Sequence, residues 1–157
     1  KNIYFKFVLV LMYTQNNKIL VKDVMLSIDK FPIVSPKNLI KETIDEMNRL
    51  SIGIACIVEE GMILKGVFCD GDIRRTIINN QQSISAFFVD DVIDHITLEY
   101  KSVDEQESLI EAVKLMGHLK IWDLPIIDSN FKLKGLLHLH PAILHLLEYS
   151  NKYIKSS

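Results

Sequence analysis

The stretch GVFCDGDIRR, residues 66–75, gathers the side chains best suited to hold an anion. Asp70 and Asp72 follow an apolar run that favours a strand, and Arg74 and Arg75 come directly after them. If a helix begins at Asp70, its first N–H groups favour a negative ligand, and an arginine can bind a phosphate through two hydrogen bonds. Adjacent helical residues point about 100° apart, so we expect only one arginine to reach such a ligand. The alternatives are that Asp70 is a plain N-cap and Asp72 a first-turn acid favoured by the helix dipole, and that an arginine forms an exposed ion pair with one of them.

His138 and His140 are a second group that can bind a polar ligand. They lie two residues apart at the end of a predicted strand, so their rings share a face. Zinc requires three or four ligands, and no carboxylate or thiol is spaced beside the pair, so we predict no metal site. We interpret the pair as a polar lining for a phosphate or a sugar hydroxyl. Trp122 either packs at a rim or stacks on a base or sugar.

The sequence contains no recognisable catalytic constellation. It lacks a glycine-rich phosphate loop, a Gly-x-Ser-x-Gly motif and a His-Glu-x-x-His motif. We therefore predict no catalytic residue and expect this chain not to be an enzyme.

The composition of the 157 residues argues against several classes of partner. Apolar residues make up 48%, enough for one substantial core or two small ones. The net charge is −2 with scattered Lys and Arg, which argues against nucleic acid. The apolar run at 3–13 is too short to span a bilayer and is interrupted by Lys6, so we expect no membrane partner. Cys56 and Cys69 lack zinc spacing and lie in apolar stretches, which predicts a reducing, cytoplasmic location.

The sequence repeats itself. Met47 and Met116 end matching helical patterns, and Gly66 and Gly135 both follow Leu-Lys, each pair being 69 residues apart. The same offset superimposes two further pairs of apolar segments, 54–58 on 123–127 and 64–68 on 133–137. A turn residue lies between the two segments of each copy, which predicts a hairpin in each.

Each copy is predicted to form a strand, a helix, a two-stranded hairpin and a second helix that starts near Asp70 or His140. About sixty residues bury too little surface alone, so we expect an α+β protein with two β-α-β-β-α repeats packed sheet to sheet in pseudo-two-fold symmetry. The predicted segments are an N-terminal segment or linker remnant at 1–19, repeat 1 at 20–80, repeat 2 at 81–150 and a tail at 151–157. Strand ends and helix starts flank the cleft between the repeats, which favours an anionic ligand there.

Over about residues 20–148 the chain resembles a tandem of CBS domains, also called a Bateman module. The characteristic element of that family is Gly, hydrophobic, any, Thr or Ser, any, any, Asp, and here it runs from Gly66 to Asp72. The resemblance implies that Asp72 holds the ribose hydroxyls of a nucleotide. Cys69 replaces the usual hydroxyl residue with a thiol, a poorer hydrogen-bond donor. In the second copy Pro141 replaces the aspartate, so that half-site is not expected to bind a ribose in the usual manner.

The resemblance also implies a pocket for the base. Ile33, Val34, Ile54 and Ala55 align with positions that line it in the family. Because all are apolar, each could equally belong to the core.

The strings LKGVFCDGDIRR and LKGLLHLH are similar to the C-terminal CBS pair of D-arabinose 5-phosphate isomerases. That resemblance implies a regulatory module, sensing an adenosine nucleotide (AMP or ATP) or a cytidine (sugar) nucleotide, for carbohydrate metabolism in lipopolysaccharide biosynthesis. The isomerase domain would lie in the same or a longer chain, because no room for it exists here.

Two alternatives stay open. The chain could be the CBS module of a sugar-nucleotide transferase, or a structural module that forms dimers without a ligand. CBS pairs commonly associate into discs, so we expect a homodimer in either case.

Overall fold

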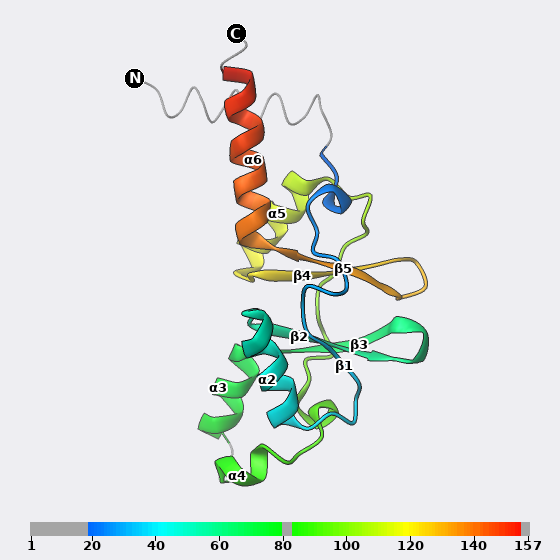
Figure 1. The fold of residues 1–157 in the computed structure, drawn as a ribbon, viewed down its shortest axis with the longest axis vertical. Coiled ribbons are helices and arrows are strands. Elements are labelled where there is room, and N and C mark those ends of the chain that lie inside the picture. Colours follow the sequence, from blue (N-terminus) through cyan, green and yellow to red (C-terminus); the bar gives the residue numbers. More distant parts are fainter. Residues whose placement is uncertain (1–18, 80–82, 155–157) are drawn as a thin grey trace.

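A computed structural model describes residues 19–79 and 83–154 (Figure 1). The apolar N-terminal run, expected to pack on the core or to be a linker remnant, lies outside the described residues. Residues 155–157 of the predicted tail also lie outside them.

The first repeat contains a three-stranded sheet and two main helices. Its elements in chain order are β1 (Ile33–Val34), α2 (Ile40–Leu50), β2 (Ile54–Glu59), the 3₁₀ turn η2 (Glu60–Met62), β3 (Ile63–Cys69) and α3 (Asp70–Asn79). Strand β1 is parallel to β2, and β2 is antiparallel to β3. The predicted order of strand, helix, hairpin and helix is therefore observed.

The second repeat follows the same plan with a shorter first strand. Its elements are α4 (Ile84–Phe87), the 3₁₀ helix η3 (Val92–His95), α5 (Leu109–Leu119), β4 (Asp123–Ile127), β5 (Leu133–His138) and α6 (Leu139–Ile154). The predicted first strand is reduced to one bridge, in which Val103 pairs in parallel with Ile126. Helix α6 continues to Ile154, into the segment that we predicted to be a tail.

The backbone conformation repeats with the same offset as the sequence. Helices α2 and α5 end at the left-handed residues Ser51 (φ 54°) and Lys120 (φ 56°), and the hairpins contain Met62 (φ 66°) and Phe131 (φ 60°). The members of each pair are 69 residues apart. The two repeats therefore share strained turn positions as well as helices and strands.

The two sheets lie between outer layers of helices (Figure 1). Cys56 and Val67 of repeat 1 pack with Leu133 and Leu136 of repeat 2 in an apolar layer between the sheets. Each sheet also packs against its own helices through a separate apolar core. This arrangement confirms the predicted α+β fold, with repeats packed sheet to sheet.

Each repeat is completed by the segment that precedes the other repeat. We call these segments the first lead-in (residues 20–28) and the second lead-in (residues 83–97). The 3₁₀ helix η1 (Val21–Asp23) precedes repeat 1, yet Val21 is fully buried in the core of repeat 2 with Leu109 and Met116. Beyond it, Leu26 and Leu136 of β5 exchange two backbone hydrogen bonds of 2.8 and 3.1 Å.

The reciprocal contact joins the second lead-in to repeat 1. Thr97 and Val67 of β3 exchange two backbone hydrogen bonds of 2.8 and 3.2 Å, and Val92 is buried beside α2 in the core of repeat 1. The packed units therefore combine segments from both predicted ranges, 20–80 and 81–150.

The glycines that mark the sequence repeat make this exchange possible. A Cβ atom on Gly66 would lie 2.9 Å from the carbonyl oxygen of Thr97, and one on Gly135 would lie 2.8 Å from that of Leu26. Carbon and oxygen atoms do not approach so closely without a shift of the backbone. The lack of a side chain at each glycine therefore leaves room for the lead-in that crosses there.

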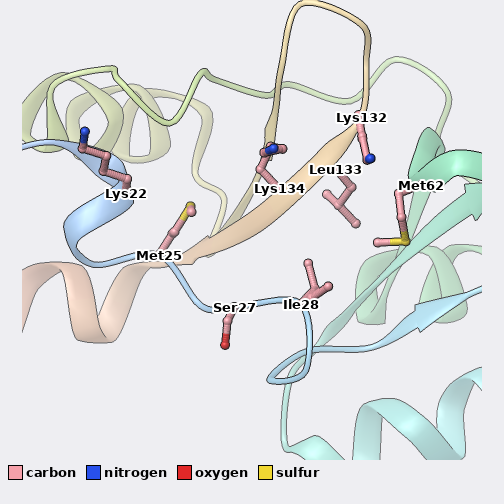
Figure 2. Close-up of a pocket in the computed structure, with 8 residues that line it drawn as sticks. All are labelled: Lys22, Met25, Ser27, Ile28, Met62, Lys132, Leu133 and Lys134. Atoms are coloured by element: carbon pink, nitrogen blue, oxygen red, sulfur yellow. The ribbon is translucent and has the colours of Figure 1, made fainter.

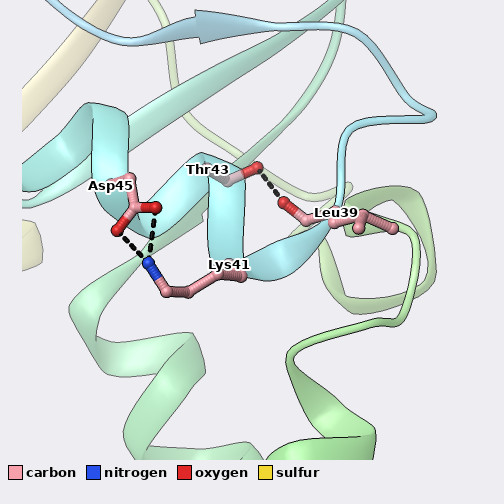
Figure 3. Close-up of polar contacts among 4 residues, drawn as sticks. All are labelled: Leu39, Lys41, Thr43 and Asp45. Carbon is pink, nitrogen blue, oxygen red and sulfur yellow. Dashed lines mark hydrogen bonds and ion pairs between the residues drawn. The ribbon is translucent and has the colours of Figure 1, made fainter.

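The start of α2 shows how the outer helix is anchored (Figure 3). Thr43 is fully buried, and its hydroxyl donates to the carbonyl oxygen of Leu39 at 3.0 Å, which satisfies the buried polar atom. Lys41 and Asp45 form an exposed ion pair one turn apart. Such a pair contributes little to stability compared with the buried face.

The exchange of the lead-ins makes a prediction for stability. Val21→Ala removes buried methyl groups from the core of repeat 2 and should lower the free energy of unfolding by about 1.5–3 kcal/mol. The matched control is Val89→Ala, since Val89 is 65% exposed. Urea unfolding of both variants should show a loss for the first alone, and equal stabilities would show that the lead-in does not belong to the core.

Candidate functional site

The junction of β3 and α3 places the Asp72 carboxylate in a buried, hydrogen-bonded position. Its side chain is 8% exposed, and Oδ2 accepts the backbone N–H of Cys69 at 2.8 Å. Burial opposes ionisation, but hydrogen bonds from Cys69, Arg75 and Thr97 outweigh it and keep the pKa of Asp72 below its ordinary value. The carboxylate is therefore a fixed negative charge at neutral pH. Asp72 thereby also stabilises the start of α3 as a first-turn acid, the structural role that we considered beside ligand contact.

Arg75, rather than Arg74, turns toward this carboxylate. Its guanidinium donates to Oδ1 of Asp72 one helical turn away. The Arg74 side chain is exposed and forms no hydrogen bond or ion pair with a described residue. The arginine side chain of the pair is 57% exposed, so Arg75 can leave the aspartate and turn to another anion.

Thr97 is a residue of this junction that the sequence analysis missed. Its hydroxyl donates to Oδ1 of Asp72 at 3.0 Å, from the lead-in of the other repeat. It places a hydroxyl beside the aspartate although Cys69 lacks one. The exchange of lead-ins brings it there, and the repeat offset alone gave no indication of it.

Asp70 and Cys69 lie at the edge of the same junction. The Asp70 N–H donates to the Gly53 carbonyl at 3.1 Å, and a Cβ on Gly53 would lie 2.7 Å from the Asp70 carboxylate. Burial first, and then the nearby Asp72 carboxylate, raises the pKa of the Cys69 thiol. Cys69 is therefore a neutral thiol beside Asp72, whereas the Asp70 carboxylate lies beside Gly53.

The corresponding junction of β5 and α6 contains a chain of aromatic and acidic groups. His138 Nδ1 lies 2.7 Å from Oδ1 of Asp123, and His140 Nδ1 lies 3.1 Å from His138 Nε2. The His140 ring stacks on Trp122 with centroids 5.5 Å apart and ring planes at 25°. Trp122 is 59% exposed, so this stack faces solvent.

Asp123 corrects our statement that no carboxylate is spaced beside the histidines. Its side chain is only 10% exposed, and burial raises the pKa of this carboxyl, while His138 opposes the rise. The sequence analysis missed it because Asp123 and His138 are brought together only by the pairing of β4 with β5.

The two junctions are electrostatic neighbours across the packed sheets. The negative charge of Asp70 in repeat 1 contributes to the raised pKa of Asp123 in repeat 2. In Figure 1 both α3 and α6 start at the same side of the stacked sheets, opposite the hairpin turns. The structure thus brings the predicted groups of both repeats to one edge of the interface.

The apolar residues predicted to line a base pocket do not share one face. Ile33 and Ile54 pack in the layer between the sheets, whereas Val34 and Ala55 pack in the core beside α2. Strand alternation separates them, because neighbouring side chains point to opposite faces. For Val34 and Ala55 the structure shows core side chains.

The described part of the chain offers neither a metal-ligand cluster nor a membrane-spanning helix. Residues 19–79 and 83–154 contain no group of three or more His, Cys, Asp or Glu side chains arranged to hold a metal ion. No helix within these ranges is long and apolar enough to cross a membrane.

Sequence comparison finds relatives that are about twice as long as this chain. It is 32% identical over 124 residues to an uncharacterised protein of Helicobacter pylori strain 26695, covering 78% of this chain and 36% of that protein. It is 28% identical over 127 residues to the arabinose 5-phosphate isomerase KdsD of Francisella tularensis, with the same coverage. The chain therefore spans about a third of the length of these relatives.

Solved structures share the fold at low sequence identity. CBSX2 in complex with AMP has a TM-score of 0.72 and 22% identity, covering 83% of this chain and 97% of that one. CBSX2 from Arabidopsis thaliana has a TM-score of 0.73 and 19% identity, covering 86% and 99%. Residues 21–79 match the family model of the CBS domain. This segment therefore belongs to the CBS domain family, and the chain as a whole has the fold of a CBS pair.

Proposed function

We propose that this chain is the ligand-sensing CBS pair of a longer arabinose 5-phosphate isomerase and that it binds a nucleotide beside Asp72. The observation that carries the proposal is the buried Asp72 carboxylate, held at the start of α3 with a movable arginine beside it. Similarity to KdsD supports the isomerase, and the AMP complex of CBSX2 supports a nucleotide. The isomerase reaction itself belongs to a separate domain.

The contacts of Asp72 suggest how a nucleotide is held. Ribose hydroxyls donate to the carboxylate in place of Arg75, because a charged acceptor forms strong hydrogen bonds. The released guanidinium then binds the phosphate, helped by the N–H groups at the start of α3. Thr97 stays beside Oδ1, where its hydroxyl contacts the ribose that Cys69 cannot contact as well.

The histidine pair supplies the second half of the site. With His138 donating from Nδ1 to Asp123, its Nε2 accepts the Nδ1 proton of His140. His140 Nε2 is then left with a lone pair for a sugar hydroxyl, or with a proton for a phosphate when the ring is charged. This polar end fits a cytidine sugar nucleotide as well as AMP or ATP.

A structural role in dimerisation is the second candidate function. Exposed apolar side chains occur on α3 and α6, the helices that start at the candidate site: Ile77, Ile78, Ile143, Leu144 and Leu147 are 41–74% exposed. Burial of such side chains between two copies would stabilise a homodimer. A CBS module of a sugar-nucleotide transferase would have the same surfaces and ligand site.

Thermal denaturation with a panel of AMP, ATP, CMP and a CMP-sugar tests the ligand site. A nucleotide present at about a hundredfold excess over its dissociation constant adds about 2.7 kcal/mol of stability. We expect at least one to raise the melting temperature by several degrees, relative to sodium chloride at matched ionic strength. If none raises it, the sensing function is wrong and the structural role remains.

The contribution of Asp72 is tested by Asp72→Asn. Loss of one or two charge-assisted hydrogen bonds at about 1.5–3 kcal/mol each should weaken the active nucleotide at least tenfold in titration calorimetry. Asp45→Asn is the matched control, because Asp45 forms only an exposed ion pair on α2. Each variant is compared with its own ligand-free stability, since Asp72 also caps α3. Unchanged affinity would leave Asp72 with the capping role alone.

Size-exclusion chromatography with light scattering tests the dimer. The wild-type protein should have twice the 18.1 kDa mass of one chain, and the double variant Ile78→Lys with Leu144→Lys should have the mass of a monomer. The control is Ile84→Lys, because Ile84 is 55% exposed on α4. A monomeric wild type, or a double variant that is still a dimer, would contradict dimerisation through this surface.

A further inference from the structure

A hollow lies at the end of the sheets that carries the hairpin turns, and Figure 2 shows its lining residues. It has a volume of about 510 Å³ and lies between the first lead-in and the two hairpin turns. The lead-in contributes Lys22, Met25, Ser27 and Ile28, repeat 1 contributes Met62, and repeat 2 contributes Lys132, Leu133 and Lys134. Met62 and Lys132 belong to the hairpin turns. Asp72 and His138 lie at the opposite ends of β3 and β5, where α3 and α6 begin.

The polar part of the hollow is cationic. Lys22, Lys132 and Lys134 line it, and the described residues place no carboxylate within 4.0 Å of their ammonium groups. Lys22 donates to the neutral side chain of Gln106 at 3.0 Å and forms no ion pair with a described residue. Lys132 and Lys134 lie two residues apart at the start of β5, and two such neighbouring charges attract an anion more strongly than separate surface lysines do.

A carboxylate in the β4–β5 turn, that of Asp128, is already engaged by backbone hydrogen bonds. Asp128 Oδ1 accepts the backbone N–H groups of Asn130 at 2.9 Å and Lys132 at 3.1 Å, and these contacts keep the pKa of Asp128 below its ordinary value. It holds the β4–β5 turn in shape. The charges of Lys134 and Lys132 also help to lower its pKa, but no ion pair within 4.0 Å joins it to either lysine. The cations are therefore available to a ligand.

The other lining residues are mainly apolar. Met25, Ile28, Met62 and Leu133 line the hollow together with the lysines. Methionine side chains adapt to different apolar shapes, so two of them suit a hydrocarbon group. A bare inorganic anion would leave this apolar lining in contact with water.

We propose that this hollow binds an organic phosphate, with its phosphate at the lysines and a carbon group against the two methionines. Its occupant contacts the first lead-in and both hairpin turns at once. The turns already meet, since Leu64 donates to the Phe131 carbonyl at 3.0 Å. Binding therefore fastens the lead-in to both repeats, independently of any nucleotide beside Asp72.

Titration of the full ¹⁵N-labelled chain with n-hexyl phosphate, at constant ionic strength, tests this site by NMR. We expect saturable shifts in the amides of residues 22–28, 62 and 132–134. Lys132→Gln combined with Lys134→Gln should weaken binding at least tenfold. Lys101→Gln combined with Lys120→Gln should not, because both control lysines are exposed and neither lines the hollow.

Two further titrations distinguish an organic phosphate in this hollow from a bare anion and from a ligand at the nucleotide site. Inorganic phosphate should bind at least tenfold more weakly than hexyl phosphate, and equal affinities would overturn an organic ligand. Asp72→Asn should leave hexyl phosphate binding unchanged, so failure of the nucleotide site and failure of this one are distinguishable. Shifts centred on residues 69–75, or equal affinity in the two double variants, would overturn the proposal.

Discussion

The reciprocal crossing of the two lead-ins is the constraint on which the remaining structure depends. Four backbone hydrogen bonds, two at Leu26 and two at Thr97, tie each lead-in to the last strand of the opposite repeat. Neither repeat is complete without the other, so the sheets must meet face to face. The absence of a side chain at Gly66 and at Gly135 is the local condition for this crossing. The common edge that carries the acidic and histidine groups is a consequence of this crossing.

The two junctions at that edge have the same backbone but different chemistry. The Asp70 N–H donates to the Gly53 carbonyl, and 69 residues later the Leu139 N–H donates to the Trp122 carbonyl. Repeat 1 then places an ionised carboxylate on the first turn of its helix, whereas repeat 2 has Pro141 there, whose side chain cannot accept a hydrogen bond from a ligand. The polar side chains of this junction are instead His138 and Asp123, which contact each other. A ligand with a sugar at one end and an anionic or polar group at the other suits this asymmetry.

The repeat offset predicted the fold well because it depends on local patterns. Helical spacing, hairpin turns and the glycines all recur at 69 residues, and all are set by neighbours in the sequence. The site was predicted less completely. Thr97 and Asp123 reach Asp72 and His138 through strand pairing and exchange of lead-ins, which no local pattern encodes. Val34 and Ala55 were aligned with a base pocket, but strand alternation points them into the core beside α2.

The exchange also determines where a bound ligand can act. Thr97 contacts Asp72 through its hydroxyl and β3 through its backbone, so the nucleotide proposed to bind at Asp72 would alter contacts of the segment that leads into repeat 2. Repeat 2 in turn encloses Val21 of the first lead-in, the described segment nearest to the start of the chain. A ligand shifts a conformational equilibrium only through its different affinities for the two states. Under the proposed function, such a difference would act on the position of one repeat against the other, and the first lead-in would move with repeat 2 because Val21 packs in its core.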